Sequence, residues 1–107
     1  MYAFRKVTLC GSTKFMKEYE EHNSRLTLEG ALVYSVAIDP HNSDKEVTEQ
    51  EKIILDLVHL GKILHSDSIF VLDVNEYIGD STKREILWAH MCDVEVEYLS
   101  DYLEELI

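Results

Sequence analysis

The stretch SIFVLDVNEYIGDSTKREI, residues 68–86, decides the fold. Its first seven residues form a nearly continuous apolar run, which is typical of a strand buried on both faces of a parallel sheet. A loop with a glycine and two hydroxyl side chains follows, and Glu85 comes in the first turn of the predicted helix. Ligands in open α/β sheets bind beyond the carboxyl ends of the strands. The stretch therefore predicts a central strand followed by a ligand-binding loop.

The loop itself can be interpreted in two ways. Gly79, Ser81 and Thr82 are candidates for binding a ligand, and Glu85 is a candidate catalytic carboxylate. Asp73, at the end of the strand, is expected to hold a hydroxyl group of the ligand or to orient Glu85. Thr82 and Glu85 also have the spacing of a capping box, in which Glu85 only accepts a hydrogen bond from the backbone of the cap. Spacing alone favours the cap.

The first third of the chain predicts a βαβ unit. A short β-prone run, Val7–Cys10, precedes a glycine turn, and Ala31–Val36 forms a second strand. Between them lies an amphipathic helix that ends at Gly30. Its apolar face is formed by residues at helical spacing: Phe15, Tyr19, His22 and Leu26. The crossover between the two strands is expected to be right-handed.

Gly11, Ser12 and Thr13 form the turn between the first strand and this helix, with Ser12 as the expected N-cap. The turn offers backbone N–H groups, two hydroxyls and the positive end of a helix dipole. These groups suit a phosphate or a carboxylate. The same residue types also occur in βα turns that bind nothing, so the turn alone does not identify a site.

A second helix is predicted from Thr48 to about Ser66, and it opens with a capping box between Thr48 and Glu51. The predicted core stripe of this helix is Ile53, Ile54, Leu57, Leu60 and Leu64, with Val58 and Ile63 widening it. Asp56 and His59 share an adjacent side and are candidates for acid–base chemistry. Without further context, a solvated helix face with an Asp/His pair three residues apart is the favoured interpretation.

The polar connector 37–47 is long enough to close over a ligand as a lid. Its Asp39, His41 and Asp44 have metal-binding side chains, but a solvated turn is favoured because no further residue completes a ligand set. Cys10 and Cys92 lack the spacing of a zinc site and are expected to be reduced packing residues. We therefore expect no metal and no cofactor.

The remaining elements complete an α/β architecture. Val94–Tyr98 alternates as an edge strand does, and Ser100 is the expected cap of a short terminal helix. Residues 1–107 should form a single domain, a Rossmann-like or flavodoxin-like three-layer sandwich around four parallel strands in the order 2-1-3-4. The two glycine-containing loops then face one another across one crevice.

The composition of the chain limits the classes of partner that the protein is expected to bind. The chain carries a formal charge of −11, from 10 basic and 21 acidic residues, which argues against nucleic acid or an anionic membrane surface. Apolar stretches approaching 18 residues and a signal-peptide pattern are absent from the sequence, so a cytoplasmic location is expected. A small anionic ligand remains compatible with this charge, because backbone N–H groups can bind an anion locally.

The motifs described above resemble those of the nucleoside 2-deoxyribosyltransferase-like superfamily, in particular its small bacterial and phage members. The resemblance extends from Val7 to Leu99, and the loop before Glu85 is its most specific part. The matching positions are Gly11-Ser12-Thr13, then Leu57, His59, Lys62, Ile63 and Asp67, then Phe70-Val71-Leu72-Asp73, and finally Tyr77-Ile78-Gly79-Asp80-Ser81-Thr82 with Arg84, Glu85, Ile86 and Ala89.

The resemblance implies roles for individual residues. Glu85 matches the glutamate with which characterised relatives attack the anomeric carbon of the sugar. In relatives that hydrolyse hydroxymethyl-deoxyuridine monophosphate, residues matching Gly11, Ser12 and Ser81 hold the 5′-phosphate. The chain departs from these enzymes at His59, where they carry a catalytic aspartate, while Asp56 lies one turn earlier. His59 or Asp56 would then protonate the departing base.

The leading hypothesis is therefore N-glycosidic bond cleavage or deoxyribosyl transfer on a nucleoside 5′-monophosphate. The alternative is a non-catalytic nucleotide-binding protein, a sensor or a sponge, and a third hypothesis is an acidic domain that binds a basic partner protein. A homodimer or larger homo-oligomer is also expected, because the terminal helix and the Trp88 region are rich in apolar side chains and relatives complete their active sites with a neighbouring subunit.

Overall fold

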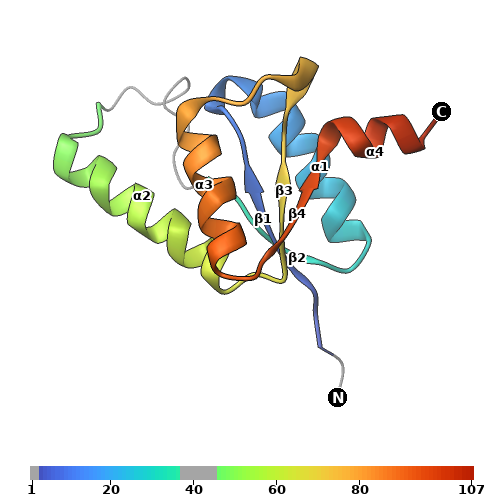
Figure 1. Cartoon of the computed structure of the whole chain (residues 1–107), viewed down its shortest axis with the longest axis horizontal. Coiled ribbons are helices and arrows are strands. Elements are labelled where there is room, and N and C mark those ends of the chain that lie inside the picture. The colour runs from blue at the N-terminus through green and yellow to red at the C-terminus, as the bar shows by residue number, and fades with distance from the viewer. Residues whose placement is uncertain (1–2, 37–45) are drawn as a thin grey trace.

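The protein is a three-layer α/β sandwich, described by a computed structural model that covers residues 3–36 and 46–107 (Figure 1). Its four strands are β1 (Lys6–Cys10), β2 (Leu32–Tyr34), β3 (Ser68–Val71) and β4 (Glu95–Tyr98). They form one sheet in the order β2-β1-β3-β4, and every neighbouring pair is parallel. The predicted fold class, strand order and strand direction are confirmed.

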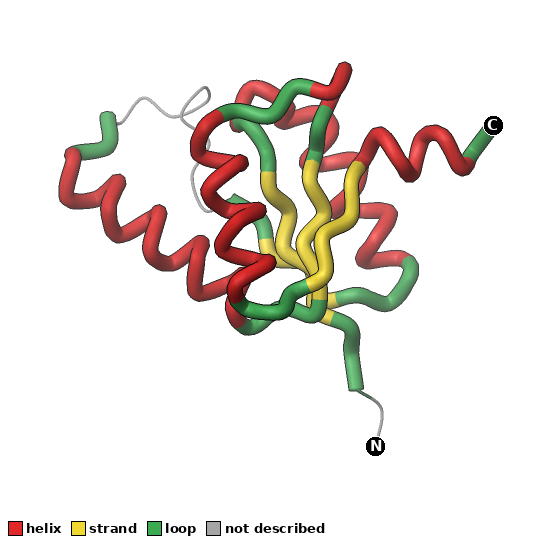
Figure 2. The backbone as a smooth tube through the Cα atoms, in the orientation of Figure 1, coloured by secondary structure: helices red, strands yellow, loops and turns green. Residues whose placement is uncertain are grey.

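Helices cover both faces of this sheet, as the tube in Figure 2 shows. The helical elements are a 3-10 turn η1 (Thr13–Phe15), α1 (Met16–Leu28), α2 (Glu49–Leu64), a 3-10 turn η2 (Val74–Glu76), α3 (Asp80–Met91) and α4 (Leu99–Glu105). Helices α1 and α4 lie on one side of the sheet, and α2 and α3 lie on the other. None of the helices in the described part of the chain is long and apolar enough to cross a bilayer.

The two central strands divide their side chains between two cores, because successive residues of a strand point to opposite faces. Val7 and Leu9 of β1 pack with Phe70 and the side chains of α1. Cys10 packs with Ile69, Val71 and the side chains of α2 and α3 in the second core. Cys10 therefore faces the layer that contains His59 and Glu85.

The end of β1 requires glycine. Gly11 has a φ of +147°, and a Cβ atom at this position would lie 3.1 Å from Leu72 Cβ and 3.2 Å from the Leu72 carbonyl oxygen. A side chain would therefore meet both an unfavourable backbone conformation and the neighbouring strand end. Ser12 then caps η1, accepting a hydrogen bond from the Lys14 N–H at 3.3 Å. The predicted N-cap is confirmed, although a 3-10 turn precedes the helix.

Helix α2 begins as predicted but packs differently. The Thr48–Glu51 capping box is present, with both hydrogen bonds at 3.1 Å. Of the predicted core stripe, Ile53, Ile54, Leu57 and Leu64 are 58%, 60%, 62% and 51% exposed, and Val58 is 50% exposed. This part of the prediction was wrong. The first half of α2, with Ile53 and Ile54, extends past the sheet (Figure 1), and Leu57, Val58 and Leu64 lie farther along the helix on a side that the described residues leave exposed. Only the second half reaches the core, through buried Ile63 and half-buried Leu60.

One tertiary hydrogen bond joins α2 to α3. The Trp88 indole N–H donates to the Leu60 carbonyl oxygen at 3.0 Å. Trp88 is half-buried and packs against the core beside Leu60. This bond anchors α2 one residue after His59.

Smaller differences from prediction concern element ends. Helix α2 stops at Leu64 instead of Ser66, β2 is limited to Leu32–Tyr34, and α4 starts at Leu99, one residue before the expected cap. The predicted lid lies largely outside the described residues. Its candidate ligands Asp39, His41 and Asp44 lie there as well, so the structure does not test them.

His22 is a titratable side chain buried in the first core. As predicted, it is buried on the inner face of α1 together with Tyr19 and Leu26. Its ring lies 5.4 Å from that of Phe70, and its Nδ1 accepts a hydrogen bond from Arg25 Nε at 3.2 Å. Burial and then the Arg25 charge lower the pKa of His22 below its ordinary 6.5. Nδ1 is an acceptor, so the imidazole is neutral in the folded protein.

Stability should therefore decrease in acid through His22. The unfolded chain protonates this imidazole from pH 6.5 downward, whereas the folded chain does so only at lower pH, so the free energy of unfolding decreases over that interval. Urea unfolding of the protein and of His22→Gln, at pH 7 and pH 5.5, measures this effect. The variant keeps a side-chain acceptor for Arg25 and should lose less stability between the two pH values. Equal losses would contradict the prediction.

Candidate active site

A cavity of about 540 Å³ opens at the carboxyl ends of β1 and β3. This volume lies in the range of small-molecule sites, and the position is the switch point of the sheet. Its walls are formed by Gly11, Ser12, Thr13, Tyr19, Val36, Val47, Lys52, Leu55, Asp56, Val58, His59, Lys62, Tyr77, Gly79, Asp80, Ser81, Thr82 and Glu85. The structure thus brings together both predicted loops and the predicted residues Asp56, His59 and Glu85.

The loop before α3 places Glu85 deeper in its helix than predicted. Asn75 and Glu76 have φ values of 52° and 64°, so the chain turns sharply after β3. Helix α3 then begins at Asp80, and its N-cap residue, Gly79, makes no side-chain hydrogen bond to the helix. The predicted capping box was wrong, because Thr82 and Glu85 both lie inside the helix. The Glu85 carboxyl is therefore not used by a cap and faces the cavity from the second turn.

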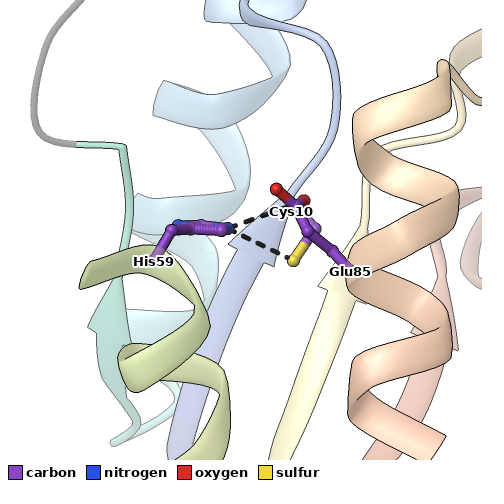
Figure 3. Close-up of side chains that lie close together, drawn as sticks. All are labelled: Cys10, His59 and Glu85. Carbon is purple, nitrogen blue, oxygen red and sulfur yellow. Dashed lines mark hydrogen bonds and ion pairs between the residues drawn. The ribbon is translucent and has the colours of Figure 1, made fainter. Parts of the chain in front are cut away.

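Glu85 meets two other side chains at the cavity wall (Figure 3). The His59 Nε2 atom lies 3.7 Å from Glu85 Oε1 and 3.6 Å from Cys10 Sγ. Cys10 is fully buried, and the His59 and Glu85 side chains are 12% and 22% exposed. The three residues come from the end of β1, the middle of α2 and the second turn of α3.

Burial determines the protonation of this cluster. It raises the pKa of Glu85 to about 7, with the neighbouring Asp56 charge adding to the increase. Burial also lowers the pKa of His59 to about 4 and raises the pKa of the Cys10 thiol, an increase to which Glu85 contributes. At neutral pH both forms of Glu85 are populated and His59 is neutral. Glu85 can thus exchange a proton or act as a carboxylate, and His59 can accept a proton.

The rest of the cavity offers groups that suit an anion. Lys52 and Lys62 lie in the wall formed by α2, although the chain as a whole is strongly acidic. The Lys62 ammonium donates to the Ser35 carbonyl oxygen at 2.7 Å, which fixes its position. Ser12 and Ser81 contribute hydroxyls from the two loops. The first turn of α3 also presents backbone N–H groups that have no partner within the helix.

Asp73 has a different place from the one predicted. Its carboxylate accepts hydrogen bonds from the Ser100 N–H at 2.9 Å and from the Ser100 hydroxyl at 2.6 Å. The side chain is buried and does not line the cavity. Both its oxygens thus bind the first turn of α4. This placement corrects the prediction that Asp73 orients Glu85 or contacts a ligand.

Sequence reasoning missed Cys10 and the two lysines as site residues. Cys10 was expected only to fill the core, yet its sulfur contacts His59. One signal was available, because Cys10 directly precedes the predicted binding turn and ends the strand. Lys52 and Lys62 lie on the same helix as Asp56 and His59. Lys62 was among the positions that match the family motif but was given no role, and nothing in the local pattern separates Lys52 from a solvated lysine.

Comparisons with known proteins add no assignment: no protein-family model matches the chain, and a search of curated proteins finds no match. The fold and the cavity define the protein as a Rossmann-like α/β protein with a cavity of about 540 Å³ at the switch point of its sheet.

The hydrogen bonds of Asp73 predict a purely structural effect. Ser100→Ala removes one of its two donors and leaves a buried carboxylate oxygen without a partner, which should cost about 1–3 kcal/mol of stability. Urea unfolding measures this loss. The matched substitution Ser81→Ala, at an exposed position, should change stability by less than about 0.5 kcal/mol. Equal effects of the two substitutions would show that the Asp73–Ser100 contact is unimportant.

Proposed function

We propose that the cavity binds a nucleoside 5′-monophosphate or a related nucleotide and that Glu85 acts on its N-glycosidic bond, giving hydrolysis or deoxyribosyl transfer. The observation that carries this proposal is the Glu85 carboxyl, which is largely buried, is not used by a helix cap and lines a cavity of nucleotide size. The resemblance of the surrounding motifs to deoxyribosyltransferase-like enzymes supports the same chemistry.

The distribution of charge in the cavity supports a phosphorylated ligand. Lys52, Lys62 and the hydroxyls of Ser12 and Ser81 suit a phosphate. The cluster around Glu85 suits the sugar, where positive charge develops as the glycosidic bond breaks. A nucleoside lacking the phosphate should therefore bind more weakly than its monophosphate.

The proposed reaction has two steps. The Glu85 carboxylate attacks the anomeric carbon, and the base leaves with the electrons of the C–N bond and takes a proton from water. Water then attacks the anomeric carbon of the glycosyl-enzyme, gives a proton to His59 and releases Glu85. Neutral His59 suits this accepting role better than the donating role inferred from the family motif. A second base in place of water would give transfer.

A panel of nucleosides and their mono-, di- and triphosphates tests this proposal. Thermal shift reports binding, and chromatography of the released base reports cleavage. Stabilisation by monophosphates with base release supports the proposed activity. Stabilisation without release supports the alternative of a non-catalytic nucleotide-binding protein, and the absence of both effects would contradict nucleotide binding.

Glu85→Gln should separate chemistry from binding. Glutamine keeps the size of the side chain but cannot form the glycosyl-enzyme, so base release should fall by at least about a hundredfold while the nucleotide still stabilises the protein. Glu20→Gln, on the exposed face of α1, is the matched control and should leave both readouts unchanged. Equal cleavage by the wild type and by Glu85→Gln would rule out the nucleophile.

We also propose that the protein self-associates through the apolar side chains around Trp88. Leu57 on α2 and Leu87 and Met91 on α3 are 62%, 61% and 69% exposed in the single chain. Sedimentation velocity should give a mass above that of one chain, and Leu57→Asp should lower it. Leu28→Asp, at an exposed position on α1 on the opposite side of the sheet, should not. A monomeric wild type at micromolar concentration would contradict this proposal.

A further inference from the structure

We propose that Cys10, His59 and Glu85 form a binding site for a zinc ion, with one coordination position open to the cavity. The ligand atoms are Cys10 Sγ, His59 Nε2 and a Glu85 carboxylate oxygen, and all lie within 4.8 Å of one another. This proposal does not depend on the proposed function, because metal binding is measured without a nucleotide.

The distances between the ligand atoms are compatible with a shared metal ion, although the 3.6 Å between Cys10 Sγ and His59 Nε2 is also within the range of a hydrogen bond to sulfur. The 3.7 Å between His59 Nε2 and Glu85 Oε1 exceeds the usual N–H···O range of about 2.7–3.2 Å. Zinc bonds of about 2.3 Å to sulfur and about 2.0–2.1 Å to nitrogen and oxygen, at tetrahedral angles, separate the ligand atoms by about 3.5 Å. The observed 3.6 Å and 3.7 Å therefore require only small movements.

The chemical types of the three ligands indicate which metal ion the site would bind. A thiolate, an imidazole and a carboxylate together suit zinc, whereas magnesium and calcium prefer oxygen ligands alone. Cys10 releases its thiol proton to solvent as the Zn–S bond forms, and the carboxylate form of Glu85 binds. The ion carries two positive charges and meets two negative ligands, so the bound cluster is neutral.

The fold holds the three ligands independently of any metal. Cys10 is fixed by the β1–β3 pairing, in which it lies opposite Val71. His59 is fixed by α2, which the Trp88–Leu60 hydrogen bond ties to α3 at the next residue. Such prior positioning lowers the conformational cost of binding an ion. His59 and Glu85 also line the cavity, so an ion can enter from it.

Three protein ligands and an open side are the arrangement of zinc sites that bind an exchangeable fourth ligand. That position, facing the cavity, suits water or an anionic oxygen of a bound molecule. A catalytic thiol explains the cluster less well, because Cys10 is fully buried and its pKa is raised, which disfavours the reactive thiolate in the metal-free protein.

Cobalt substitution tests the site directly. Untagged protein, reduced with a phosphine, is titrated with Co²⁺ and then with Zn²⁺ while absorption is recorded. We expect one Co²⁺ per chain, visible bands of a tetrahedral ion and a thiolate-to-cobalt charge-transfer band, all removed by Zn²⁺. Absence of these bands in the wild type would overturn the proposal.

Variants identify the ligands. Cys10→Ser should lose the charge-transfer band, whereas Cys92→Ser, at the other cysteine of the chain, should keep it. Since Cys10 is buried, Glu85→Gln provides a second test in a folded protein, and its zinc affinity in competition with a chromophoric chelator should fall by about tenfold or more. Circular dichroism checks the fold of each variant. A band that depends on Cys92, or a zinc affinity unaffected by Glu85→Gln, would overturn the assignment.

The same competition experiment keeps this proposal separate from the proposed function. Zinc binding by a protein whose metal-free form releases no base would leave the metal site standing and overturn only the glycosidase assignment. If both hold, zinc should inhibit base release, because it engages the carboxylate that attacks the sugar.

Discussion

The parallel pairing of β1 with β3 is the constraint on which the rest of the structure depends. It brings the carboxyl ends of both strands to one edge of the sheet and places Cys10 beside Val71. The chain leaving β1 then passes close to Leu72 with a positive φ at position 11, and this combination favours glycine there. Both loops of the cavity start from these two strand ends, so their separation is determined by backbone hydrogen bonds rather than by flexible side chains.

The two faces of the sheet serve different purposes. The core on the α1 and α4 side is formed by large buried side chains such as Tyr19, Leu26 and Phe70. The face covered by α2 and α3 combines a core with the polar cluster of Cys10, His59 and Glu85. Burial of that cluster raises the pKa of one carboxyl and lowers that of one imidazole, because charged forms are poorly solvated there. The α1 and α4 side of the sheet is thus an apolar core, whereas the α2 and α3 side also holds titratable groups that are partly desolvated.

Local patterns predicted the strands, their order and the two loops, because apolar runs and glycine turns are signals contained within short segments. The predictions that failed depend on distant residues. Asp73 binds Ser100, 27 residues later, and Cys10 meets a histidine 49 residues later. The spacing of Thr82 and Glu85 matches a capping box, but α3 already begins at Asp80, so neither residue is at the helix start. Periodicity identified the apolar stripe of α2, but periodicity does not say what covers such a stripe.

The hydrogen bond between Trp88 and the Leu60 carbonyl also gives the protein an internal optical reporter. Trp88 is the one tryptophan in the sequence, so its emission comes from a single, known environment. The indole lies at the contact between α2 and α3, the two helices that carry His59 and Glu85. A change in the distance between these helices would alter the polarity around the ring, and the fluorescence spectrum would report it without any attached dye.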